Sequence, residues 1–350
     1  LRRGKAADFA RRGHVTSTVA TWDSRRSGPV QFDEAVKLVV DKVPTEYPKH
    51  MLCYFAANAA RGVVLPFTAG LCRTLAEIDS ATPGYAAEMT DRLAGIAGTG
   101  EEQYEAVLQI LAEVYVTQGV VAAASQGGAA AQVVHEPGPA GKKNPECEAL
   151  IEGTWCAIEV KTPKLIAHAR QRSSNPWQVT ARVPRETTKD FQLTPPRDNP
   201  VKDFLVSAEA KFTAYEGHRA DALRLLFIIW DDFCNEPISA LLSPVSGLLT
   251  DQSFHRTAAG AAVVYPHVDG IAVVRHQHQL LRATREEPLA DGVVDAMRFR
   301  HDGFPPKAFI QMPGGRPVPG DVLDALNLAP LHACLGAEYI PGEIIMWSGG

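Results

Sequence analysis

Four charged side chains between residues 146 and 161 are spaced so that they could act together on a metal ion. Glu146, Glu148, Glu159 and Lys161 flank the dipeptide Glu152-Gly153, which suits a two-residue turn between antiparallel strands. In such a hairpin the numbers of opposed residues add up to 305. The spacing therefore predicts that Glu146 faces Glu159 across the hairpin.

The alternation of side chains along a strand gives this predicted hairpin two unlike faces. The apolar face carries Cys147, Ala149, Ile151, Cys156, Ile158 and Val160. On the charged face, opposed carboxylates repel each other, and a cation that prefers oxygen ligands, such as Mg²⁺ or Mn²⁺, would remove that repulsion. Lys161 could orient a water molecule or stabilise a charged transition state. The alternative interpretation is a solvent-exposed strand face, on which Lys161 only offsets the glutamates.

Periodicity predicts the elements that would position these residues. The pattern favours helices over 101–120 and 201–215, and strands over 131–135, 147–151, 155–160, 223–230 and 271–275. Residues 162–200 are polar and proline-containing, and we expect a long irregular insertion there. The order helix, three strands, helix, strand indicates the α/β class.

Pro145-Glu146, twelve intervening residues and then Glu159-Val160-Lys161 resemble the signature of the PD-(D/E)XK nuclease superfamily. The resemblance implies a restriction-endonuclease-like αβββαβ core, here with a helical N-terminal region and a C-terminal extension. It implies that Glu146, Glu159 and the Val160 carbonyl bind Mg²⁺ or Mn²⁺ and that Lys161 assists the attacking water. Family members often carry one more acid on the preceding helix, which points to Glu113, with Glu105 as the weaker choice. If the register is shifted, Glu148 takes the place of Glu146.

The activity implied by this resemblance is metal-dependent hydrolysis of phosphodiester bonds, as in a DNA endonuclease of restriction, defence or repair. Phosphate contacts would come from basic residues of the insertion, namely Arg170, Arg172, Arg182 and Arg185. Whether the substrate is DNA or RNA, and whether the enzyme is an endonuclease or an exonuclease, stays open. A homodimer and a separate ATPase or specificity subunit are further partners that the resemblance allows.

Two other interpretations stay open. Glu146 stands where the family usually has aspartate, which favours a catalytically inactive nuclease fold acting as a nucleic-acid-binding or structural module. A second alternative is an iron site built from His267, Asp269 and the histidines His276 and His278.

Composition and charge set the remaining expectations. The 350 residues include 45% hydrophobic and 21% charged residues, which is typical of a globular protein. We expect no transmembrane helix, because no run of 18 apolar residues occurs. The six cysteines form no Cys-x-x-Cys pair, so we expect reduced thiols and a cytoplasmic location.

The net charge is −5, but residues 1–30 carry +5 and residues 161–202 carry +6, and these two basic segments would attract a polyanion. The predicted organisation is a basic flexible arm (1–30), a helical region (31–100), the nuclease-like core (101–280, insertion 162–200) and a C-terminal extension (281–350).

Overall fold

The computed structural model describes residues 29–126, 130–138, 143–175, 177–179, 182, 193–301, 306–334 and 346–348. The predicted arm over 1–30 lies almost entirely outside these residues. The helices are α1 (Phe32–Lys42), α2 (Cys53–Ala60), α3 (Pro66–Ala81), α4 (Tyr85–Ala94), α5 (Glu101–Ala124), α6 (Ile166–Ser174), α8 (Asn199–Tyr215), α9 (Asn235–Leu242), α10 (Gln277–Thr284), α11 (Gly320–Ala325) and α12 (Leu331–Cys334). The strands are β1 (Val133–His135), β2 (Cys147–Ile151), β3 (Thr154–Lys161), β4 (Trp177–Val179), β5 (Leu223–Trp230), β6 (Gly270–Arg275), β7 (Lys307–Gln311), β8 (Leu328–Pro330) and β9 (Met346–Ser348).

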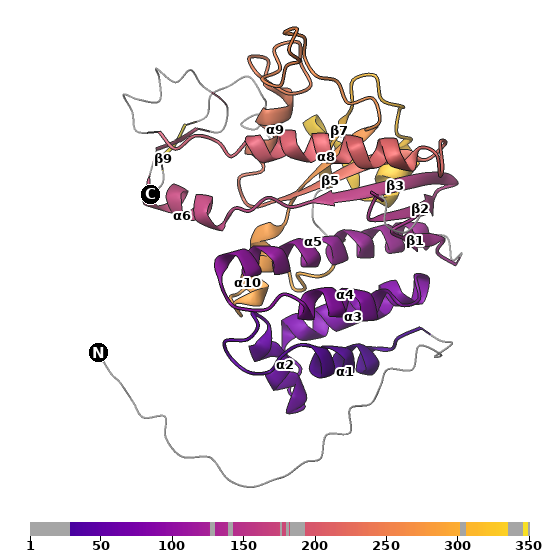
Figure 1. Ribbon diagram of the computed structural model, residues 1–350, viewed down its shortest axis with the longest axis vertical. Coiled ribbons are helices and arrows are strands. Elements are labelled where there is room, and N and C mark those ends of the chain that lie inside the picture. Colours follow the sequence, from indigo (N-terminus) through magenta and orange to yellow (C-terminus); the bar gives the residue numbers. More distant parts are fainter. Residues whose placement is uncertain are drawn as a thin grey trace.

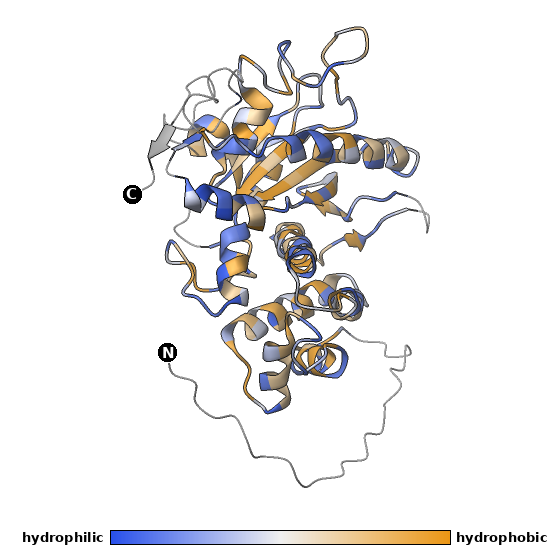
Figure 2. Cartoon of the chain, turned by 60° about the vertical axis from the view of Figure 1, so that its left-hand side comes forward, coloured by the Kyte–Doolittle hydropathy of each residue, from blue (hydrophilic) through white to orange (hydrophobic). Residues whose placement is uncertain are grey.

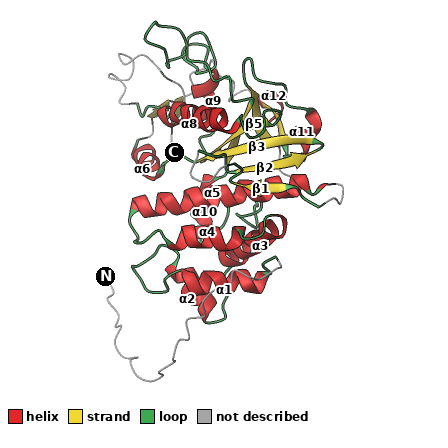
Figure 3. Cartoon of the chain, turned by 45° about the vertical axis from the view of Figure 1, so that its right-hand side comes forward, coloured by secondary structure: helices red, strands yellow, loops and turns green. Residues whose placement is uncertain are grey.

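Seven strands form one mixed sheet in the order β1-β2-β3-β5-β6-β7-β8. The pairs β3–β5, β5–β6 and β7–β8 are parallel, whereas β1–β2, β2–β3 and β6–β7 are antiparallel. Figure 3 shows helices on both faces of this sheet. The predicted α/β class is confirmed.

The central strand β5 feeds two hydrophobic cores, one on each face of the sheet. All eight of its residues are buried, as expected for a strand covered on both sides. Side chains such as Leu225 and Phe227 pack into the core shared with α5, whereas Leu226 and Ile228 pack into the core shared with α8 and α9. Figure 2 shows the sheet as the hydrophobic centre of the molecule, with the more hydrophilic helix faces outside.

The predicted hairpin is confirmed over the five pairs that β2 and β3 form. Strands β2 and β3 pair antiparallel from Ile151↔Thr154 to Cys147↔Ile158, so opposed residues add up to 305. Glu152 and Gly153 at the turn have φ values of 45° and 73°, and two successive positive φ values fit the type I′ turn that suits a two-residue hairpin. All six side chains predicted on the apolar face lie in the core shared with α5.

The predicted order of helix, three strands, helix and strand is present as α5, β1, β2, β3, α8 and β5. The prediction that residues 162–200 are irregular is wrong in part, because α6 and β4 form there. The predicted C-terminal extension adds β7 and β8 to the same sheet.

Helix α5 separates the sheet from the helices α1–α4 (Figure 1). Its 24 residues are apolar enough to cross a membrane by length and composition, yet 78% of its most apolar window is buried inside the protein. Both sides of the helix are used for packing, since it contacts α3 and α4 as well as β2 and β3. The burial is that of a core helix.

Candidate metal centre

Glu146 and Glu159 come together at the end of the hairpin, where β3 runs three residues past its last pair with β2. The ammonium of Lys211 lies 2.9 Å from Glu146 Oε1 and 2.9 Å from Glu159 Oε2. Both carboxylates therefore present an oxygen to one positive charge. Val160 lies in the same overhang, and its side chain packs into the core shared with α5.

Lys161 completes this cluster from the same face of β3. Its Nζ lies 2.6 Å from Glu159 Oε1, so Glu159 contacts two ammonium groups. The Glu159 side chain is fully buried, whereas those of Lys161 and Lys211 keep about a fifth of their surface exposed. The sequence predicted Lys161 in this position, but it gave no signal for Lys211, which reaches the site from α8, 50 residues further along.

The interpretation of the charged face as a solvent-exposed strand face is wrong. Glu146, Glu148 and Glu159 are all buried, with exposed fractions of 8%, 2% and 0%, because α8 lies over this face of the hairpin. Burial of ionised carboxylates is costly unless they are paired. The cluster offsets that cost by setting two ammonium groups against Glu146 and Glu159.

The pKa values follow from this burial and pairing. Burial raises the pKa of Glu159 above its ordinary value, with Lys161 and Lys211 acting in the opposite direction and Glu146 adding to the rise. Burial disfavours the charged form of Lys211, but Glu159 and Glu146 outweigh it and raise its pKa. Lys211 is therefore a stable cation, held between two acids.

The predicted third acid, Glu113, lies near the cluster but has its own partner. Its carboxylate is 2.6 Å from Arg92 Nη2 of α4. Burial and the neighbouring charge of Glu146 raise the pKa of Glu113 to about 7, although Arg92 and Lys211 oppose the shift. The weaker choice, Glu105, instead accepts a hydrogen bond of 2.9 Å from the Ile166 amide at the start of α6.

Glu113 makes the stability dependent on pH. Its folded-state pKa is raised, so between pH 4.5 and 7 the folded protein keeps a proton that the unfolded chain loses. The free energy of unfolding should therefore fall as pH rises, by up to about 3 kcal/mol relative to Glu113→Gln, and level off above pH 8. Urea unfolding between pH 4.5 and 8.5 measures this difference, with Glu102→Gln on the exposed face of α5 as control. Parallel curves for wild type and Glu113→Gln would contradict it.

Glu148 does not substitute for Glu146. Its carboxylate accepts a hydrogen bond from the Tyr215 hydroxyl and lies 3.2 Å from Arg219 Nε, and the Arg219 guanidinium also stacks on Trp155. Glu148 thus ties the hairpin to the end of α8.

The prediction that Arg172 contacts phosphate is wrong, because this side chain is buried. Its guanidinium pairs with Asp231 and with Glu236, the latter at 3.1 Å, and lies over the Phe233 ring. This guanidinium connects α6 to the end of β5 and cannot reach a ligand in solvent.

Two of the other arginines predicted to contact phosphate are more exposed than Arg172. Arg170 is exposed and pairs with Glu101, whereas Arg182 pairs with Asp198 and stacks on Phe254. Arg185 lies outside the described residues.

The histidines proposed for an iron site do not share a centre. His267 Nδ1 lies 2.5 Å from Glu209, Asp269 lies 2.7 Å from Arg316, and the His276 ring bonds the Ala296 carbonyl. Each side chain is held by a different partner, which does not favour the iron interpretation.

Among the described residues, only Glu88, His135 and Glu136 bring three ligand groups within 4.8 Å of one another. Glu146 and Glu159 therefore offer a two-carboxylate site, which fits a divalent cation that also takes carbonyl and water oxygens. Comparisons of this chain with protein-family models, with curated proteins and with solved structures find no match.

Proposed function

We propose that this protein is a metal-dependent nuclease with a restriction-endonuclease-like core, acting on DNA. The observation that carries the proposal is the convergence of Glu146 and Glu159 on one cationic group, with Lys161 2.6 Å from Glu159. The hairpin that creates this convergence has the register that the Glu152-Gly153 turn predicts. The order of α5, β1–β3, α8 and β5 also agrees with the αβββαβ core.

The chain's own residues have separable roles in this proposal. Glu146, Glu159 and the Val160 carbonyl would hold Mg²⁺ or Mn²⁺, which when bound neutralises a phosphodiester and lowers the pKa of a water molecule. Lys161, partly exposed beside Glu159, would orient the attacking water or stabilise negative charge on the phosphate. Lys211 would leave its position between the carboxylates when the metal enters, since both cations need the same oxygens.

A cleavage assay tests the proposal. Linear, circular and single-stranded DNA are incubated with Mg²⁺, Mn²⁺ or EDTA, and wild type is compared with Lys161→Ala and Glu159→Ala. We expect cleavage that requires the metal and is lost in both variants, because each variant removes a group that acts on the metal or the water.

The control is Lys202→Ala, which removes a partly exposed lysine of α8 that pairs with Asp203; this variant should cleave as wild type does. Cleavage of circular DNA would indicate endonuclease action. Activity that survives in EDTA or in Glu159→Ala would contradict the proposal.

The second candidate is a nuclease fold that binds nucleic acid without cutting it. Lys211 favours it, because an ammonium group already neutralises both carboxylates. Retention of DNA in a mobility-shift assay without cleavage under either metal, and without any Mn²⁺-induced rise in melting temperature, would support this candidate against the first.

A further inference from the structure

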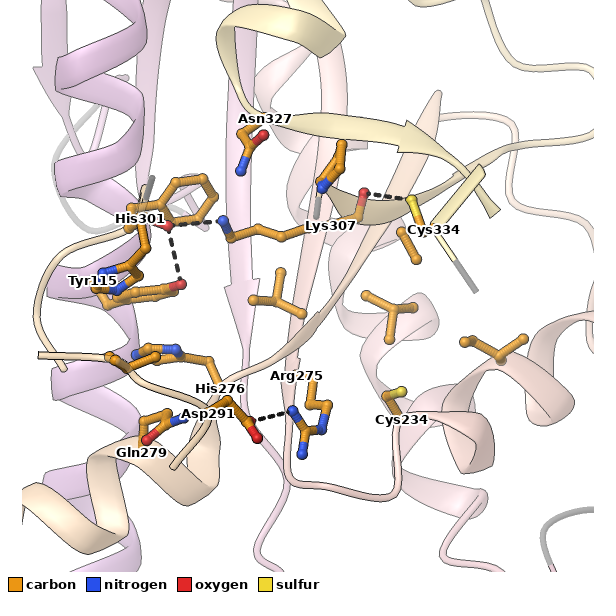
Figure 4. A pocket seen from close by; sticks show the side chains of 17 residues that line it. Tyr115, Cys234, Arg275, His276, Gln279, Asp291, His301, Lys307, Asn327 and Cys334 are labelled. Atoms are coloured by element: carbon orange, nitrogen blue, oxygen red, sulfur yellow. Dashed lines mark hydrogen bonds and ion pairs between the residues drawn. The ribbon is translucent and has the colours of Figure 1, made fainter. Parts of the chain in front are cut away.

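A cavity of about 180 Å³ lies beside β6 and β7, away from the carboxylate cluster. Strand β5 separates β6 from β3, which carries Glu159 and Lys161. The cavity walls are largely apolar, with Ile238, Val273, Val274 and Phe299 among the lining residues. Figure 4 shows the side chain of Lys307 extending across this cavity on the side of Tyr115.

The Lys307 amine contacts one carbonyl group and one aromatic ring of the described residues. Its Nζ donates a hydrogen bond of 2.8 Å to the Phe299 carbonyl and lies 3.9 Å from the centre of the Phe299 ring. In the part of the chain that the structure describes, no carboxylate lies within ion-pair distance of this amine. An ammonium group has three donors to satisfy, and here it has one carbonyl acceptor.

Lys211 provides the contrast within the same protein. Both lysines are largely buried, but Lys211 contacts two carboxylates and keeps its charge. Burial, with a smaller contribution from Arg300, lowers the pKa of Lys307 to about 7. About half of the Lys307 amines are then neutral at pH 7, against about one in 2,500 for an ordinary exposed lysine.

We propose that this cavity is a binding site for a small apolar aldehyde and that Lys307 Nζ forms an imine with it. The nitrogen lone pair adds to the carbonyl carbon, and the carbinolamine then loses water. The carbonyl oxygen and the two amine hydrogens leave together as that water, so no oxidant or reductant is needed. A cavity of about 150 Å³ accommodates benzene, so an aromatic aldehyde of that size matches the volume and the apolar walls.

Reductive trapping with benzaldehyde tests this site. The full chain is treated with benzaldehyde and cyanoborohydride at pH 7, and labelled lysines are located by peptide mass spectrometry. We expect labelling at Lys307 at least about tenfold faster than at the exposed Lys37, because far more of its amine is neutral. Labelling at Lys307 no faster than at Lys37 would overturn the proposal.

Two controls separate cavity binding from general reactivity. Benzyl alcohol has the size of the probe but no carbonyl, so it should slow labelling at Lys307 and leave Lys37 unaffected. Lys307→Met should remove the fast label while its melting temperature stays the same or rises, since an unpaired buried amine is lost. Labelling at Lys307 that benzyl alcohol does not slow would refute the cavity as the binding site. This test is independent of nuclease activity.

Discussion

Replacing Lys211 by methionine is expected to lower the free energy of unfolding by about 3–5 kcal/mol at pH 7, because removing one partner leaves buried charges uncompensated. Glu146 loses the ammonium 2.9 Å away, and the fully buried Glu159 keeps only Lys161. Urea unfolding of wild type and Lys211→Met measures the loss. Lys202→Met is the matched control on the same helix, and its surface pair with Asp203 should change stability by less than about 1 kcal/mol.

The pH dependence of this loss identifies its cause. Burial already raises the pKa of Glu159 and Lys211 opposes that rise, so without Lys211 the pKa of Glu159 rises further. The variant should therefore regain stability relative to wild type as pH falls and this carboxyl takes up a proton. A deficit that is the same at pH 5 and pH 8 would contradict uncompensated charge as its origin.

Lys211→Met also tests the proposed metal binding. If Lys211 and the divalent cation compete for the same oxygens, Mn²⁺ should raise the melting temperature of Lys211→Met more than that of wild type, since ligand binding to the folded state stabilises it. An equal response of both proteins to Mn²⁺ would place the metal elsewhere.

Arg172→Met is expected to be as damaging, with a loss of about 3–5 kcal/mol in the free energy of unfolding at pH 7. The variant leaves Asp231 and Glu236 buried without their shared guanidinium. Burial already raises the pKa of Asp231, and Arg172 opposes that rise, so the deficit should shrink as pH falls.

The control for this prediction lies two residues away on the same helix. Arg170→Met breaks a surface pair with Glu101, which should cost no more than about 1 kcal/mol. Chemical denaturation of both variants at pH 5 and 7 provides the comparison. Equal losses for the two variants would show that burial is not the deciding factor.

The hairpin and its charged face could be predicted because their determinants are local. Strand alternation and the Glu152-Gly153 turn define which residues oppose each other, and the register from Ile151↔Thr154 to Cys147↔Ile158 followed. Strand β5 could also be predicted, because a strand that is buried on both faces is a continuous apolar run in the sequence.

The partners of the charges could not be predicted in the same way. Lys211 lies 50 residues from Lys161 in the chain and reaches Glu159 only because α8 packs over β3. Arg172 belonged to a basic segment that suggested phosphate contacts, but the acids that pair with it, Asp231 and Glu236, lie about 60 residues further on. Charge composition describes a segment, whereas pairing depends on the tertiary fold.

The burial of α5 on both of its sides has a consequence for how the protein folds while it is being synthesised. The helix is followed by the sheet that covers one side and preceded by α3 and α4, which contact the other. As α5 leaves the ribosome, α3 and α4 are already available to shield it, although β2 and β3 are not. A chain starting at Gly100 would expose the side of α5 that packs against α3 and α4, and we expect such a truncation to aggregate or to associate with lipid.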